Sequence, residues 1–210
     1  MKNAETEEID SLIDRLFSTQ AGNTSYGPSP QAQQQVPTAL LSIANRSADA
    51  KEKVIRALIK LLEDNADGGE DIAFYNACGL LGELRAVEAI DTLVKYIDYQ
   101  PGHIGTSLNS KPAVKGLILI GEAAIPKIAE ALMSHTSHLH PNDHLLLLNA
   151  IAALRNIGGA QAKQALETAS SVEQDARSKE MMELAIQDIM RAGGSTSNVV
   201  VIKARKTDYM

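Results

Sequence analysis

Three glycines, Gly82, Gly121 and Gly158, recur along the chain at steps of 39 and 37 residues. Each follows an apolar run and precedes a second stretch whose aliphatic residues recur with helical spacing. Self-similarity at a period of this length is the signature of an architecture made of repeated supersecondary units. The spacing of the glycines therefore predicts a row of similar units, each built from two helices.

The helical patterns can be grouped in pairs by the short breaks between them. In chain order the pairs are 36–46 with 51–64, 72–84 with 86–98, 112–121 with 124–134, and 144–159 with 160–171, and a last pattern at 178–193 has no partner. A glycine at the end of the first helix of a pair can close that helix in the left-handed conformation and lets the second helix approach closely. We expect Gly82, Gly121 and Gly158 to act in this way.

The stretches NACGLLGELRAVEAIDTLVKYI and AVKGLILIGEAAIPKIAEAL resemble HEAT repeats, particularly bacterial repeats similar to those of the phycobilisome lyase family. The resemblance extends over residues 36–192 when the irregular ends are counted. It implies an all-α fold, a right-handed HEAT-like solenoid of four to five helix pairs, and a function as a scaffold that binds partner proteins. As an alternative, the resemblance implies a bilin lyase-like enzyme or accessory.

The chain divides by composition into three parts. Residues 1–34 combine an acidic amphipathic helix with a linker rich in Gly, Pro, Ser and Gln, and we expect them to form a tethered arm. Residues 35–192 form the repeat domain. Residues 193–210 form a tail with four β-favouring residues from Val199 to Ile202, which either pairs as a strand or is disordered.

Charge and hydropathy limit the classes of partner. The net charge of −6 and the pI near 5.4 argue against nucleic acid, because binding to a phosphate backbone requires clustered Lys and Arg. No apolar run is long enough to cross a bilayer or to serve as a signal peptide, so we expect a cytoplasmic protein without a membrane partner. The single cysteine, Cys78, lies in an apolar run and is expected to be a buried thiol.

Charged residues recur at fixed offsets after the glycines and predict a binding face on the second helices. Asp91, Glu130 and Glu167 stand nine positions after the three glycines. With Ser47 in the place of glycine in the first unit, the full set of predicted partner-binding residues is Lys53, Arg56, Glu88, Asp91, Lys127, Glu130 and Glu167. We expect this face to be basic at one end and acidic beyond it, and to bind a protein partner or the arm or tail of the chain itself. The alternative is that these charges are the solvated sides of amphipathic helices.

One cluster invites metal chemistry. His135, His138, His140 and His144, with Asp143, fall within ten residues, and imidazoles with a carboxylate are suitable ligands for zinc, nickel or copper. Their spacing matches no ordered ligand pattern. We therefore predict no catalytic residue, no metal site and no cofactor, with a metal-dependent enzyme built on the loop from His135 to His144 as the alternative.

Overall fold

The computed structural model describes residues 4–18, 30–64, 71–99, 111–135 and 143–194, and all regular structure in them is helical. This confirms the predicted all-α class. The α-helices are α1 (Ala4–Ser18), α2 (Pro30–Ala44), α3 (Ala48–Asp64), α4 (Asp71–Glu83), α5 (Ile90–Lys95), α6 (Pro112–Ile120), α7 (Ile125–His135), α8 (Asp143–Ile157), α9 (Gly159–Val172) and α10 (Ala176–Gly194). Two 3-10 turns, η1 (Val87–Ala89) and η3 (Glu122–Ala124), precede α5 and α7. Among the described residues, no helix combines the length and apolar character needed to cross a membrane.

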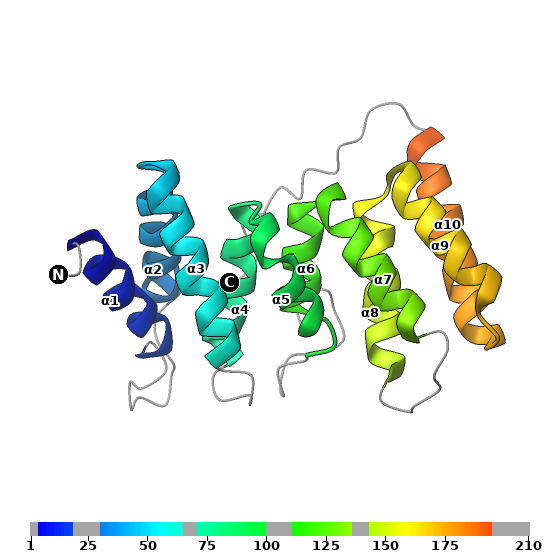
Figure 1. Cartoon of the computed structure of the whole chain (residues 1–210), viewed down its shortest axis with the longest axis horizontal. Helices are drawn as coiled ribbons and strands as arrows, with labels where there is room; N and C mark the ends of the chain where they lie inside the picture. The colour runs from blue at the N-terminus through cyan, green and yellow to red at the C-terminus, as the bar shows by residue number, and fades with distance from the viewer. Residues whose placement is uncertain (1–3, 19–29, 65–70, 100–110, 136–142, 195–210) are drawn as a thin grey trace.

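The helices alternate between two rows. Helices α1, α3, α5, α7 and α9 form one row, called here the odd row, and α2, α4, α6, α8 and α10 form the even row behind it (Figure 1). Each helix contacts the next helix of its own row, and most helices also contact their chain neighbours in the other row. The result is a layer two helices thick that grows in the order of the sequence.

The core lies between the two rows, because both rows turn their apolar sides toward each other. Its largest fully buried side chains are Ile9, Leu16, Leu40, Ile43, Leu58, Leu62, Leu81, Leu93, Ile97, Leu117, Ile128 and Leu132. They belong to one continuous cluster of buried residues that runs from Ile9 to Ile189. Burial of aliphatic side chains of this size is the main source of stability in such a layer.

Helix α1 belongs to the odd row, and this corrects the predicted tethered arm at residues 1–34. Ile9, Leu12 and Leu16 are buried in the core, and α1 packs on α3. The other end of the predicted linker also differs, because α2 already begins at Pro30, where a proline suits the first turn of a helix. Residues 19–29 lie outside the described part of the chain.

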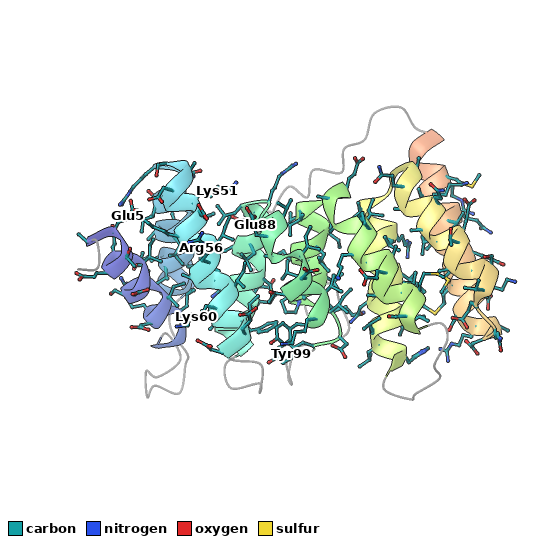
Figure 2. All side chains as sticks on the ribbon, in the orientation of Figure 1. Glu5, Lys51, Arg56, Lys60, Glu88 and Tyr99 are labelled. Carbon is teal, nitrogen blue, oxygen red and sulfur yellow. The ribbon has the colours of Figure 1, made fainter. Side chains whose placement is uncertain are left out.

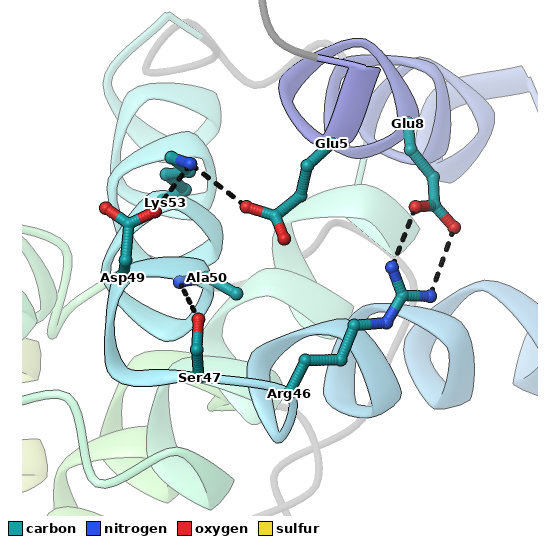
Figure 3. A network of polar contacts seen from close by, with 7 residues as sticks. All are labelled: Glu5, Glu8, Arg46, Ser47, Asp49, Ala50 and Lys53. Atoms are coloured by element: carbon teal, nitrogen blue, oxygen red, sulfur yellow. Dashed lines mark hydrogen bonds and ion pairs between the residues drawn. The ribbon is translucent and has the colours of Figure 1, made fainter.

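Two ion pairs attach α1 to its neighbours (Figure 3). Arg46, which follows α2, donates to both carboxylate oxygens of Glu8, with Nη1 3.0 Å from Oε2. Lys53 on α3 reaches Glu5, with Nζ 3.0 Å from Oε1. The Glu8 carboxylate raises the pKa of Arg46 above its ordinary value, first through the hydrogen bond and then through its charge. These contacts fix the rotation of α1 that its buried face already requires.

The repeated glycines have two different roles. The close approach of the second helix that was predicted at Gly121 and Gly158 is wrong, because a Cβ at either glycine would meet no atom within 4 Å. Both glycines follow their helices, α6 and α8, with φ of 87° and 72°, as predicted for residues that close a helix. The same prediction is wrong for Gly82, which lies inside α4, while the positive φ of the α4–α5 turn belongs to Arg85 at 50°. A Cβ at Gly82 would lie 2.9 Å from the Cβ of Leu119 and 3.0 Å from the Cα of Gly116. Gly82 therefore allows α4 and α6 to approach closely within the even row.

The backbone oxygen of Cys78 lies at this same contact, and the Cys78 thiol provides a probe of stability. Its side chain is fully buried, and burial raises the pKa of the thiol, so that little of the reactive thiolate forms. We expect iodoacetamide at pH 8 to alkylate the native chain at least about a thousandfold more slowly than the chain in urea, because alkylation requires opening of the core. Mass spectrometry of the alkylated protein measures both rates. Comparable rates would show that α4 opens freely.

Candidate functional site

The seven residues predicted to bind a partner all belong to elements of the odd row, and all are exposed or half-buried. Lys53 and Arg56 lie on α3, Glu88 on η1, Asp91 on α5, Lys127 and Glu130 on α7, and Glu167 on α9. Figure 2 shows Arg56 and Glu88 among the side chains along this row. They differ in which of them lie together and in the charge that they present.

Three of the seven meet at one point between α5 and α7. Lys127 Nζ lies 3.1 Å from Glu130 Oε2 on its own helix and 3.3 Å from Asp91 Oδ1 on the neighbouring helix. The hydrogen bonds to Glu130 and Asp91, in that order, raise the pKa of Lys127. The cluster carries one positive and two negative charges and links two successive units across the exposed face.

The α3 end of the odd row is electrically balanced, in contrast to the basic end that the offsets predicted. Lys53 Nζ lies 2.6 Å from Asp49 Oδ2 and 3.0 Å from Glu5 Oε1, and these two partners raise the pKa of Lys53. Arg56 pairs with Glu52 one turn earlier on α3. Helix α3 contains four basic and four acidic residues, so its charges cancel even before α1 adds its acids.

From η1 to α9 the odd row is acidic. The charged residues of its described stretches 87–99, 122–134 and 159–172 are Glu88, Asp91, Asp98, Glu122, Glu130 and Glu167 against Lys95, Lys127 and Lys163. Six acids against three bases give an excess of three negative charges. A partner that covers α5, α7 and α9 together therefore meets a net negative surface.

The turns between the two helices of a unit differ in length, so charged residues at the same offset from the glycines do not occupy equivalent positions in successive units. Three residues, from Leu84 to Ala86, separate α4 from η1, whereas only Gly121 separates α6 from η3. Ala86 and Gly121 are the residues that precede the two 3-10 turns. Lys95 follows Ala86 by the same number of positions as Glu130 follows Gly121, so Lys95 is the equivalent of Glu130. Asp91 thus lies one turn away from the line of Glu130 and Glu167, which explains why it meets Lys127 instead.

A groove between α7 and α9 was not predicted from the sequence. It has a volume of about 360 Å³. Its apolar lining consists of Ile125, Pro126, Ala129, Met133 and Ala165, and its polar lining of Glu130, Gln161, Gln164 and Thr168. The available signal was an alanine on each of two successive second helices, Ala129 and Ala165, where a longer side chain would fill the space. Of the predicted residues, Glu130 lies at the groove itself.

A second groove lies on the even row, between α2, α4 and α6, and its chemistry differs. It measures about 410 Å³ and is lined by Pro37, Thr38, Leu41, Tyr75, Asn76, Gly79, Leu80, Glu83 and Lys115. Lys115 Nζ lies 3.4 Å from the hydroxyl oxygen of Tyr75 and 5.3 Å from the centre of its ring. This groove is similar in size to the α7–α9 groove, but it lies on the even row and mixes polar and apolar groups. Substitutions in it therefore serve as controls for substitutions on the odd row.

The predicted histidine cluster falls largely outside the described residues. Residues 136–142, with His138 and His140, are not described, and the side chains of His135 and Asp143 are not described either. His144 is exposed at the start of α8. In the described part of the chain, no group of three His, Cys, Asp or Glu side chains is arranged to hold a metal ion.

No family profile, no curated protein and no solved structure matches this chain. The features of this chain that bear on its function are the two grooves and the distribution of charge.

Proposed function

We propose that this chain is a non-catalytic scaffold of the HEAT type, a right-handed α-solenoid that binds a partner protein along the odd row from α5 to α9. The observation that carries the proposal is the apolar groove between α7 and α9 on the acidic part of the row. Apolar pockets flanked by charged residues are typical of surfaces that bind peptides or helices, where the pocket takes an anchoring side chain and the charges select the partner.

The alternation of the two rows supports the solenoid part of the proposal. Helices α6 and α8 end at Ile120 and Ile157, which are 37 residues apart, and a glycine with positive φ follows each of them. The second helix of each pair then returns to the odd row (Figure 1). Units that repeat in sequence and in geometry, and that contact chiefly their neighbours, are the defining property of a solenoid.

The charge of the odd row indicates the chemistry of the partner. An excess of three negative charges between η1 and α9 favours a segment with basic residues. The apolar lining of the groove, from Ile125 to Ala165, favours an apolar side chain in the same segment. We therefore propose an amphipathic basic segment of another protein as the bound element.

Charge reversal tests the proposal. The variant Asp91→Lys, Glu130→Lys, Glu167→Lys makes the net charge of the odd row more positive by six units. We expect the amount of partner captured from a native lysate, as measured by quantitative mass spectrometry, to fall at least about tenfold. The control variant Glu83→Lys, Glu180→Lys, Glu183→Lys makes the same change on the exposed even row. Equal losses in the two variants would contradict a site on the odd row.

A further inference from the structure

We propose that residues 199–206 of this same chain bind in the α7–α9 groove and so compete with the partner for it. The segment reads VVVIKARK, four apolar residues followed by a basic run. The proposal uses the groove of the proposed function but requires no partner protein. Three features of the structure carry it, namely the position at which α10 ends, the open surface beside that position, and the charge of the odd row.

Helix α10 ends on the side of the molecule where the groove lies. Only residues 173–175 join α9 to α10, so the two helices are antiparallel, and α10, which is the longer of the two, ends beyond the start of α9 (Figure 1). The groove begins at the first turns of α7 and α9, with Pro126 and Gln161, and extends along both helices to Met133 and Thr168. The end of α10 and the near end of the groove therefore lie at the same end of α9.

The polar residues that precede the apolar run are long enough to cross from one row of helices to the other. Residues 195–198, with the sequence STSN, span about 13 Å when extended. Packed helices have axes about 8–10 Å apart. Four residues are thus enough to pass from the even row to the odd row, and the apolar run that follows, Val199 to Ile202, adds the length needed to reach the near end of the groove on the exposed side of α9.

The surface between α10 and the groove is open. A Cβ at Gly158 would meet no atom within 4 Å, and a Cβ at Gly159 would meet only Glu122 Oε1, at 3.8 Å. These two glycines form the start of α9 and leave room for another backbone to cross it. The Glu122 carboxylate stands beside this crossing and can attract a basic segment.

The charges of the segment and of the odd row are complementary. Lys203, Arg205 and Lys206 give residues 199–206 three positive charges and no negative charge. The odd row from η1 to α9 has an excess of three negative charges. When Val199 to Ile202 pack against the apolar lining of the groove, the basic residues that follow lie over the carboxylates of α7 and α5. Added salt would weaken the contacts between these basic residues and the carboxylates.

Disulfide trapping in the full chain tests the proposal without any partner. The variant Val200→Cys, Gln164→Cys places one thiol in the segment and one in the α7–α9 groove, whereas Val200→Cys, Asn76→Cys places the second thiol in the even-row groove. Because a docked segment has a high effective concentration at its own groove, we expect the first pair to form an intramolecular disulfide at least about tenfold faster than the second. Dilute protein and non-reducing electrophoresis separate this product from cross-linked dimers, and buried Cys78 does not interfere.

Adding Lys203→Glu, Arg205→Glu and Lys206→Glu to the first pair should slow its disulfide formation at least about tenfold. Gln161→Cys provides another thiol at the same groove if the Gln164 variant does not fold. Equal rates for the two pairs would overturn the proposal, as would a fast rate that charge reversal leaves unchanged. The assay uses only the purified chain, so a negative result would not argue against partner binding at the odd row. Likewise, a failure to detect partner binding would not argue against docking of the segment in the groove.

Discussion

Replacing Gly116 with valine is expected to disrupt the packing of α4 on α6 and to lower the free energy of unfolding by about 3 kcal/mol or more. A Cβ at Gly116 would lie 2.7 Å from the backbone oxygen of Cys78 and 3.3 Å from Leu93 Cδ1. A backbone oxygen inside α4 cannot move away unless the whole helix shifts. Because domains are stable by only about 5–15 kcal/mol, a loss of this size is severe. Urea denaturation followed by circular dichroism measures it.

Gly79 provides the matched control for this prediction. It also lies within a helix of the even row, in α4, but a Cβ at this position would meet no atom within 4 Å. Alanine restricts the unfolded chain and favours the helix, so Gly79→Ala should raise the free energy of unfolding by about 0.5–1 kcal/mol. If Gly116→Val were tolerated as well as Gly79→Ala, the close contact between α4 and α6 would not exist in solution.

The sequence predicted those parts of the fold that depend on local patterns. Helical spacing of aliphatic residues predicted the all-helical class, and Gly121 and Gly158 close their helices as expected. Gly82 was misinterpreted because it also follows an apolar run, and its real role depends on Gly116, a residue of another helix. A sequence does not show which glycine ends a helix and which one allows two helices to touch.

The position of α1 was not predicted for a similar reason. Its apolar positions were identified, but an amphipathic helix has the same pattern whether its apolar face meets the same chain or another protein. In the structure Ile9, Leu12 and Leu16 enter the common core, and Glu5 and Glu8 pair with Lys53 and Arg46. These partners lie 38 and 48 residues away in the sequence, beyond any local signal.

The candidate site was predicted only in outline. The offsets placed all seven charged residues on elements of the odd row, but the alignment between units failed at the longer α4–α5 turn, where Lys95 takes the place assigned to Asp91. The groove between α7 and α9 escaped prediction because it depends on the space between two helices. Its lining residues are ordinary alanines, glutamines and aliphatic residues in the sequence.

Filling the α7–α9 groove is expected to have the largest effect on function. Ala165 is half-buried in the lining of the groove, and arginine at this position would occupy the space that the partner's apolar side chain requires. It would also bring a positive charge against a partner proposed to be basic. Loss of an anchoring contact typically costs about 2 kcal/mol or more, so Ala165→Arg should weaken the affinity for the partner about thirtyfold or more.

The most direct measurement is a calorimetric titration of the captured partner into the purified wild-type chain, Ala165→Arg and Asn76→Arg. Asn76 lines the even-row groove, so its substitution adds the same side chain on the opposite face of the molecule. Circular dichroism and thermal denaturation of the three proteins confirm that each is folded. A scaffold that binds through the odd row predicts wild-type affinity for Asn76→Arg and an affinity about thirtyfold or more weaker for Ala165→Arg. Wild-type affinity for Ala165→Arg, or an equal loss in both variants, would contradict it.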